Sequence, residues 1–504
     1  MIPSSRPHDI RQSVGNPRGL LDQPALWRIF LLLILLASTA SAAERPPNFL
    51  VILMDDMGWQ DVGFMGNRFV ETPHLDRLAK GGLTFTQAYA SAPNCAPTRA
   101  CLMSGQYTPR HGIYTVVDPR QPPGSPWHKL TAADSQSELD TNVITIAEAL
   151  QSGGYATGFF GMWNLGRGRT GPVTPGGQGF QTVVFPDNLG FGKDEYFDNE
   201  MNYLSDRLTD EVISFVEKNR DQPFFAYLPD HAVHAPYNPK PDLLAKYQKK
   251  LGMGNSKTAG NRPRSGERGY EEDPAYAATI EAVDQNVGRL METLTKLKLV
   301  DNTVVFFMSD NGGTQQYTAP LRGGKGELYE GGIRVPMMVS WPGLRKSGSQ
   351  FAEPVSSIDL YPTLLDLAQL PASRNQIQDG VSLVPALRGE KHLARERLFW
   401  HFPCYVGKAT PCSAVREGNY KLIEFFEEGG HLELYDLQAD PYEVHDLSKK
   451  LPDKTKSMAR TLKEWQTQTQ AALPPGPNPA YDPQADRPRG GQTGGRSPGR
   501  QPKK

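Results

Sequence analysis

The sequence predicts an α/β fold, a mostly parallel central sheet sandwiched by helices, with a smaller C-terminal α+β subdomain. Four short apolar runs, each closed by polar residues or glycine, are typical of strands buried on both faces. Helix-like segments such as TNVITIAEALQSGG separate them, and this alternation is typical of a parallel sheet with helices on both sides. The four runs are NFLVILMDD, TGFFGMWN, PFFAYLPDHAVHAP and NTVVFFMSDNGG.

The bulk composition is that of an ordinary globular protein. The chain has 504 residues, of which 38% are hydrophobic and 22% charged, enough for one large domain and a smaller one. The formal net charge is −1, so no global field attracts nucleic acid, and we expect no nucleic-acid partner.

The first residues, 1–43, are expected to be a signal peptide and leader rather than part of the fold. Arg28 precedes an apolar run at 29–37 and small residues at 40–42, which together indicate a secretory signal and a secreted or periplasmic mature protein. The run is short for a bilayer span, so we expect no stable membrane insertion after cleavage; the alternative is an uncleaved anchor.

The rest of the chain divides into three parts by character. Residues 44–388 carry the strand and helix alternation. Residues 389–474 contain short strand-like segments such as SAVREGNYKLIEFF and a closing helix, which indicates the α+β subdomain. Residues 475–504 are rich in proline and glycine and basic at the end, which predicts a disordered tail.

Polar residues follow the apolar runs where a parallel sheet binds its ligands, beyond the carboxyl ends of the strands. Asp55 and Asp56 close the first run, and Asp310 with Asn311 closes the fourth. Adjacent aspartates at a buried strand end are unfavourable unless a cation neutralises them. Hard oxygen ligands suit calcium or magnesium. The alternative for either pair alone is a turn-forming role, but the two pairs together favour a metal site.

The chain has four cysteines, Cys95, Cys101, Cys404 and Cys412, and neither a disulfide framework nor a zinc pattern. Cys404 and Cys412 flank a loop with turn residues, so their spacing allows a bridge. Cys95 and Cys101 would lie on nearly opposite faces of a helix and make a poor pair. We expect Cys101 to be a packed core residue.

Cys95 lies in SAPNCAPTRACLMSG, just before a predicted helix whose first turn suits Pro97 and Thr98. Unpaired N–H groups and the helix dipole favour anions there, so we expect the thiol to be acidified. Arg99, one turn further, is placed to hold a charged group. The alternative for Cys95 is a small buried hydrophobic residue.

Several motifs in order resemble those of one family. CAPTRACLMSG resembles the sulfatase signature, in which the cysteine is oxidised after synthesis to formylglycine, an aldehyde. DDMGW and SDNGG resemble the family's two metal motifs, LRGGKGELYEGGIRVP its lysine-bearing loop, and AVHAP its histidine motif. The chain is therefore identified as a member of the formylglycine-dependent, arylsulfatase-like family within the alkaline-phosphatase-like superfamily.

The resemblance implies a metal site and a maturation step. One calcium ion per chain, with magnesium less favoured, would be held by Asp55, Asp56, Asp310, Asn311 and the residue at Cys95. A formylglycine-generating maturation enzyme would convert Cys95. Residues 44–388 would then be the catalytic domain.

The resemblance also implies a mechanism. One hydroxyl of hydrated formylglycine attacks the sulfur of a sulfate ester and the alcohol leaves; the second then loses its proton and the carbon expels sulfate, restoring the aldehyde. Calcium and Arg99 would lower the pKa of the hydrate and screen the sulfate oxygens. Lys325 would contact the sulfate or the leaving oxygen, and His234 would protonate the leaving group. The alternatives are a solvated lysine and a packed histidine.

One stretch departs from the family pattern. The family usually reads GKWHLG where this chain reads GMWNLG. Met162 replaces a lysine that contacts the sulfate, and Asn164 replaces a histidine that hydrogen-bonds a formylglycine hydroxyl; both are candidate substrate residues here. Asparagine does not shuttle protons at neutral pH. Losing one preorganised electrostatic contact reduces the rate by about 10²–10³.

Three functions are consistent with these residues. The leading hypothesis is an exported sulfuric-ester hydrolase that acts on a sulfated small molecule or polysaccharide, with a carbohydrate favoured by family habit and export. The second is a sulfate-ester-binding pseudoenzyme or weakly active homologue, because of Met162 and Asn164. The third is a phosphoryl hydrolase of the same superfamily with Thr98 or unmodified Cys95 as nucleophile; the intact signature makes it the least favoured.

Restoring the family's residues, by Met162→Lys together with Asn164→His, is expected to raise kcat/KM for a simple aryl sulfate by up to about 10²-fold. The lysine returns a charge and the histidine a proton-exchanging group. Steady-state kinetics of the wild type and the double variant check this. No gain, or a loss on the natural substrate, shows that the two positions have been reassigned.

Overall fold

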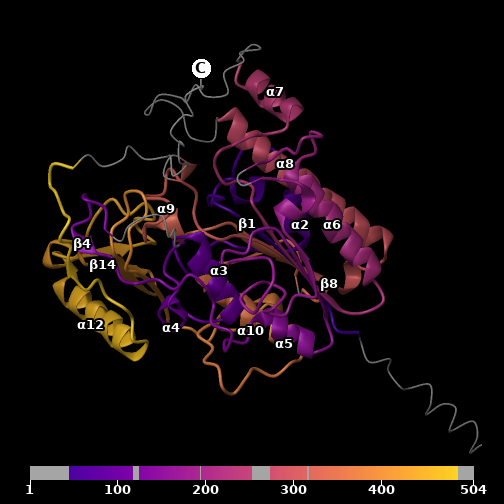
Figure 1. Cartoon of the computed structure of the whole chain (residues 1–504). Helices are drawn as coiled ribbons and strands as arrows, with labels where there is room; N and C mark the ends of the chain where they lie inside the picture. The colour runs from indigo at the N-terminus through magenta and orange to yellow at the C-terminus, as the bar shows by residue number, and fades with distance from the viewer. Residues whose placement is uncertain are drawn as a thin grey trace, which may run out of the picture. The chain divides into compact units, whose positions relative to one another are not determined.

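An eight-stranded sheet forms the centre of the computed structural model of the chain, which describes residues 45–116, 124–192, 195–252, 273–314, 317–344 and 346–485 (Figure 1). In order across the sheet, the strands are β10 (Ser349–Phe351), β2 (Leu83–Phe85), β9 (Met337–Ser340), β8 (Thr303–Ser309), β1 (Asn48–Met54), β7 (Phe224–Asp230), β5 (Ala156–Phe160) and β6 (Thr182–Val184). β8, β1, β7, β5 and β6 are parallel, and β9 is antiparallel to both of its neighbours. The predicted mostly parallel sheet is confirmed, and the four apolar runs form β1, β5, β7 and β8.

Helices cover both faces of this sheet, as predicted. Side chains of β1 alternate between two hydrophobic cores, because successive residues of a strand point to opposite faces. One core is closed by α2 (Pro73–Gly81), α6 (Leu204–Lys218), α7 (Pro241–Lys250) and α8 (Pro274–Lys296). The other is closed by α3 (Cys95–Ser104), α5 (Ile146–Ser152), α10 (Leu360–Leu367) and α11 (Val384–Leu387). Figure 1 shows α6 and α8 running side by side, away from α3 and α5.

Local capping signals fix where the helices begin. α5 starts with a capping box, in which the Thr145 hydroxyl accepts from the Glu148 N–H and the Glu148 carboxylate accepts from the Thr145 N–H. α8 has Pro274 at its first position, and the Asp273 carboxylate caps it by accepting from two backbone N–H groups. The helix predicted at 141–154 is therefore confirmed with shifted ends.

The C-terminal part is a four-stranded antiparallel sheet with a helix on one face, which confirms the predicted α+β subdomain. Its elements are β12 (Arg397–Phe402), β13 (Cys412–Glu417), β14 (Tyr420–Phe425), β15 (His431–Asp436) and α12 (Pro452–Gln468). One face packs on α12, and the other packs on Tyr89, Leu328 and Ile333 of the preceding domain. Shorter elements include β3 (Ala88–Tyr89), α4 (Thr108–His111), α9 (Glu330–Ile333) and β11 (Val355–Ser356).

The disordered tail predicted for 475–504 does not hold for its first residues. β16 (Gly476–Pro477) pairs with β4 (Leu130–Thr131), and the Asn478 N–H donates to the Lys129 carbonyl at 2.9 Å. A distant partner therefore orders a segment whose composition alone favours disorder. Residues 486–504 and the predicted leader at 1–43 lie outside the described residues. Within the described ranges, no helix has the length and apolar character needed to span a bilayer.

All four cysteines are buried free thiols, so Cys404 and Cys412 do not form the bridge that their spacing allowed. The Cys404 sulfur lies 3.8 Å from the Ala133 carbonyl oxygen. Cys101 is fully buried with its sulfur 3.4 Å from His111 Nε2, which confirms it as a packed core residue.

A buried ion-pair cluster fastens the C-terminal sheet to the first domain. Lys421 of β14 is fully buried, and its Nζ lies 2.8 Å from Glu330 Oε1 and 2.6 Å from Glu443 Oε1. Glu443 also accepts from the Glu330 N–H at 2.7 Å. Glu330 begins α9, directly after the loop that carries Lys325. The cluster therefore fixes one end of that loop.

Lys421→Met is expected to lower the free energy of unfolding by about 3 kcal/mol or more, because it leaves Glu443 buried without its cation and leaves Glu330 with Arg334 alone as its ion-pair partner. Urea unfolding of wild type and variant measures the change. Lys454→Met is the control, since Lys454 is 35% exposed and its pair with Glu417 at 3.3 Å is worth less than about 1 kcal/mol. Equal losses in the two variants would contradict the interpretation.

Candidate active site

Four neighbouring parallel strands end at one edge of the sheet, and the predicted site residues follow them. Asp55 and Asp56 follow β1, and Asp310 and Asn311 follow β8. His234 comes shortly after β7. Because β8, β1, β7 and β5 are adjacent and point the same way, residues far apart in the sequence meet here.

The backbone at two strand ends is shaped to bring these residues together. Asp56 has φ +65°, a left-handed conformation that aspartate tolerates better than most residues. Gly161, after β5, has φ +137°, and a Cβ there would lie 2.1 Å from the Pro229 carbonyl oxygen. Only glycine fits this approach, which lets the Met162 N–H donate to that carbonyl at 3.1 Å.

The acidic residues and Cys95 form one buried cluster. Carboxylate oxygens of Asp55 and Asp310 and the Cys95 sulfur all lie within 4.8 Å of one another. The Asn311 side-chain amide donates to Asp56 Oδ1 at 2.7 Å. All five residues that the sequence proposed as metal ligands are therefore brought into one place, each at most 5% exposed.

The donor set fits a hard divalent cation. Asp55 Oδ1 and Asn311 Oδ1 are buried and have no hydrogen-bond partner among the described residues. Buried acceptors without partners are rare, because each forgoes the hydrogen bonds that water would supply. Carboxylate and amide oxygens are the ligands that calcium and magnesium take.

Arg99 lies inside this cluster, only 1% exposed. Its Nη2 lies 2.8 Å from Asp310 Oδ2 and 3.1 Å from Asp55 Oδ2, and its Nε lies 3.0 Å from Asp310 Oδ2. Its Nη1 donates to the Met162 carbonyl. The guanidinium is thus held among the proposed ligands and positions two of their carboxylates.

Burial and mutual repulsion set the protonation of the two carboxylates. Burial and the neighbouring Asp55 raise the pKa of Asp310 to about 7, against the opposing effect of Arg99. Burial also acts to raise the pKa of Asp55, but Arg99 and His231 hold it well below its usual value. The protein's own cations therefore keep Asp55 ionised but compensate the negative charge of Asp310 less fully.

Cys95 is the first residue of α3, and the Asn94 side chain accepts from its N–H at 2.7 Å. The expected acidification of the thiol is wrong for the unmodified residue. Burial raises the pKa of Cys95 to about 12, against the lowering effect of Lys325, and nearby Asp55 and Asp310 also act to raise it. The helix end is outweighed mainly because the thiol is fully buried, which disfavours its charged form.

Lys325 reaches the site from the loop before α9. Its Nζ lies 2.6 Å from Asp56 Oδ1, and the side chain is 16% exposed. The loop is held by two backbone bonds, from the Lys325 N–H to the Gly313 carbonyl at 2.9 Å and from the Gly326 N–H to the Pro93 carbonyl at 2.7 Å. It therefore bridges the second metal motif and the segment before Cys95.

His234 lies at the open side of the cluster. Its Nε2 is 3.7 Å from Asp56 Oδ2, the side chain is 32% exposed, and its Nδ1 lies 2.6 Å from the Ala235 carbonyl oxygen. The ring stacks on His231, with centroids 5.0 Å apart. One ring nitrogen is thus engaged by the backbone while the other faces the carboxylates.

Met162 and Asn164, the two residues that differ from the family pattern, have different surroundings. Met162 takes part through its backbone, since its carbonyl accepts from Arg99. Asn164 has φ +61°, a left-handed conformation in which asparagine is common. No side-chain hydrogen bond joins Asn164 to Cys95 within the described residues.

Comparison with known proteins places this geometry in a family. The sulfatase family model matches residues 47–370, and the model of the C-terminal region of N-sulphoglucosamine sulphohydrolase matches residues 324–471. A sulfatase of Formosa agariphila is 30% identical over 87% of this chain and 92% of its own length.

The chain belongs to the sulfatase family.

Other relatives agree with this assignment. Human arylsulfatase A is 30% identical over 88% of this sulfatase and 92% of its own chain. The crystal structure of Ps i-CgsB in complex with k-i-k-neocarrahexaose is 29% identical, covers 85% of this chain and 95% of its own, and superposes with a TM-score of 0.68. The chain is accordingly a sulfatase, a sulfuric ester hydrolase.

Two residues beside the cluster, His231 and Asn94, were given no role by sequence reasoning. His231 is 5% exposed, with Nδ1 3.8 Å from Asp55 Oδ2. Asn94 caps α3 and also accepts from the Cys95 thiol at 3.2 Å. His231 follows the same strand as His234, and Asn94 is a favourable capping residue directly before the signature cysteine. Both signals were present in the sequence.

Removing bound metal is expected to lower the unfolding temperature of this sulfatase, and calcium is expected to restore it. A ligand present at a hundred times its Kd stabilises by about 2.7 kcal/mol. Differential scanning calorimetry before and after chelation measures the shift. The calcium response should be lost in Asp310→Asn and kept in Asp453→Asn, an exposed aspartate of α12. An unchanged unfolding temperature, with the metal shown to be gone, contradicts the metal site.

Proposed function

We propose that this sulfatase releases inorganic sulfate from sulfated carbohydrates, using a formylglycine made from Cys95 and a bound Ca²⁺. The observation that carries the proposal is the convergence of Cys95, three carboxylates and Lys325 at one edge of the sheet. An aldehyde hydrate at this position supplies two hydroxyls on one carbon, one to attack sulfur and one to expel sulfate.

Asp55, Asp56, Asp310 and Asn311 would hold the cation together with the residue at Cys95. A cation held by these residues would supply Lewis acidity for the transfer of the sulfate group. The unpartnered oxygens of Asp55 and Asn311 support this assignment.

Lys325 and His234 are the side chains placed to meet the ester. Lys325 keeps its charge, because Asp56 and nearby carboxylates raise its pKa well above the usual value although burial acts to lower it. It can bind a sulfate oxygen as the bond to sulfur breaks. His234, partly exposed and held through Nδ1, has Nε2 available to protonate the leaving alcohol.

Arg99 has a positioning role in this proposal. Its Nε, Nη1 and Nη2 all donate within the cluster, to Asp55, Asp310 and the Met162 carbonyl. It keeps the carboxylates oriented toward a common centre and reduces their repulsion. It also adds positive charge near the position of the sulfate.

A carbohydrate substrate is supported by a similar protein of known structure. Ps i-CgsB, which is similar to it over most of both chains, binds k-i-k-neocarrahexaose. Together with the secretory signal predicted at residues 1–43, this favours sulfated saccharides outside the cytoplasm as substrates. A second candidate function is sulfate-ester binding with weak turnover, which Met162 and Asn164 favour because neither supplies the charge or proton exchange of the family's residues.

Protein made together with a maturation enzyme is expected to carry an aldehyde at residue 95 and to release sulfate from at least one member of a panel of sulfated saccharides. Mass spectrometry of the peptide spanning Cys95 and ion chromatography of sulfate measure both on one preparation. Cys101, on the same helix, is the internal control and should remain a thiol.

Protein made without the maturation enzyme should show neither aldehyde nor sulfate release. Release by protein whose residue 95 is entirely unmodified cysteine would overturn the formylglycine mechanism. A converted residue with binding but no turnover of the panel would favour the second candidate function.

A further inference from the structure

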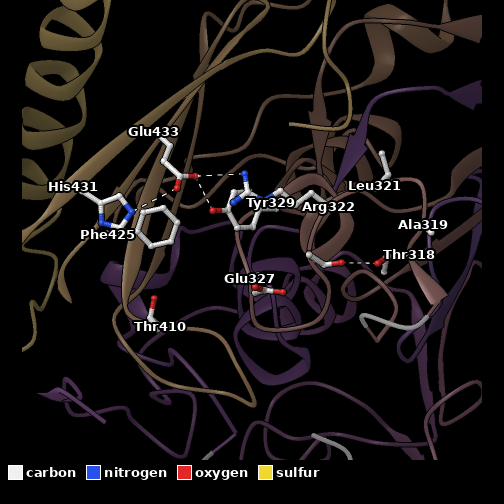
Figure 2. Close-up of a pocket in the computed structure, with 11 residues that line it drawn as sticks. Thr318, Ala319, Leu321, Arg322, Glu327, Tyr329, Thr410, Phe425, His431 and Glu433 are labelled. Atoms are coloured by element: carbon white, nitrogen blue, oxygen red, sulfur yellow. Dashed lines mark hydrogen bonds and ion pairs between the residues drawn. The ribbon is translucent and has the colours of Figure 1, made fainter. Parts of the chain in front are cut away.

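A cavity of about 540 Å³ lies between the lysine-bearing loop and the C-terminal sheet (Figure 2). Its volume falls within the range of about 300–1,000 Å³ typical of small-molecule sites. One wall comes from residues 318–329 and the other from β14, β15 and Thr410. None of its lining residues belongs to the cluster around Cys95.

The cavity borders the active site through the loop itself. Gly323 and Glu327 line the cavity and stand two residues before and after Lys325, whose Nζ contacts Asp56. Two residues of extended chain span at most about 7 Å. The backbone of Lys325 therefore lies within this distance of backbone that lines the cavity.

One wall is a preorganised polar network. Arg322 donates to the Tyr435 hydroxyl at 2.8 Å, and Tyr435 and Tyr329 each donate to Glu433 Oε2 at 2.7 Å. The guanidinium also lies 3.9 Å from the centre of the Tyr329 ring. Figure 2 shows Glu433 joined to Tyr329 by its hydrogen bond and to Arg322 by an ion pair of 3.8 Å. Groups that are already oriented bind a polar ligand with little further loss of entropy.

Beside this network the cavity offers a flat ring surface, because His431 Nε2 lies 3.6 Å from Glu433 Oε1. His431 stacks on Phe425 with ring centroids 4.5 Å apart and planes 9° from parallel, and the His431 side chain is 54% exposed. Aromatic faces carry negative charge density, which attracts the polarised C–H groups on the face of a sugar ring. A flat ring surface beside fixed hydroxyl, carboxylate and guanidinium groups matches a hexose.

The charge of the lining sets which sugar fits. Glu327 and Glu433 supply two carboxylates against the single guanidinium of Arg322. Even if the His431 imidazole is counted as a full cation, the lining carries no net positive charge. A second sulfate group would therefore find no electrostatic compensation in this cavity.

We propose that this cavity binds an unsulfated hexose unit that adjoins the sulfated unit of the substrate. The inference rests on the proposed sulfatase action on carbohydrates and specifies its substrate class. The sulfatase would select saccharides in which a sulfated unit neighbours a neutral one, over sulfated monosaccharides and over uniformly sulfated chains.

The kinetic test compares three substrates on the mature enzyme: a sulfated hexose, the disaccharide that extends it with an unsulfated hexose, and the disaccharide sulfated on both units. His431→Ala should lower kcat/KM for the singly sulfated disaccharide about tenfold and leave the monosaccharide unchanged. His445→Ala is the matched control, a histidine of the same subdomain that is 75% exposed and lies outside the cavity. It should change none of the three.

Equal effects of His431→Ala on monosaccharide and disaccharide, or no effect, overturn the proposal. A wild-type preference for the doubly sulfated disaccharide overturns its charge argument. If the wild type hydrolyses none of these and no aryl sulfate, the proposed function fails, and a binding measurement then decides about the cavity.

That measurement is saturation-transfer NMR with cellobiose, lactose and mannobiose on the wild type, His431→Ala and His445→Ala. Binding of at least one disaccharide that weakens in His431→Ala alone supports the cavity as a sugar site. Absence of binding by all three, or binding that His431→Ala leaves unchanged, overturns it.

Discussion

Three carboxylates buried around one point form the constraint on which the site depends. Asp55, Asp56 and Asp310 are each at most 3% exposed, and the full cations paired with them in the described chain are Arg99 and Lys325. Concentrating like charge away from water is strongly unfavourable unless each charge is met by a partner. The cluster therefore requires one further positive charge, and the unpartnered Asp55 oxygen marks where its coordination is incomplete.

The surrounding fold serves to hold this unfavourable arrangement. Adjacent parallel strands place the carboxylates at one edge of the sheet. Arg99 comes from α3, and Lys325 comes from the loop before α9. That loop is fixed at its far end by the buried Lys421, Glu330 and Glu443 cluster, so the C-terminal sheet takes part in placing Lys325. Stability of the subdomain contact and geometry of the site are thus coupled.

Local patterns predicted much of this from sequence, and nonlocal contacts account for the rest. The strands were predictable because apolar runs with polar ends are local signals, and the meeting of the proposed ligands because strand ends in a parallel sheet converge. The thiol pKa of Cys95 was not, since it depends on burial and on carboxylates more than two hundred residues apart in the chain. The order of 475–485 depends on pairing with β4, which composition does not encode.

The contact of Met162 bears on what its substitution means for turnover. Arg99 donates to the carbonyl of residue 162, and any side chain at this position can present that carbonyl, so replacing the family's lysine leaves Arg99 in place. The change is then one of charge. With a divalent cation bound, three carboxylates, Arg99 and Lys325 would leave the site with one net positive charge, apart from its histidines. A sulfate ester carries one negative charge, so the site can still bind its substrate without the family's lysine, and what Met162 removes is one contact to the charge that develops in the transition state.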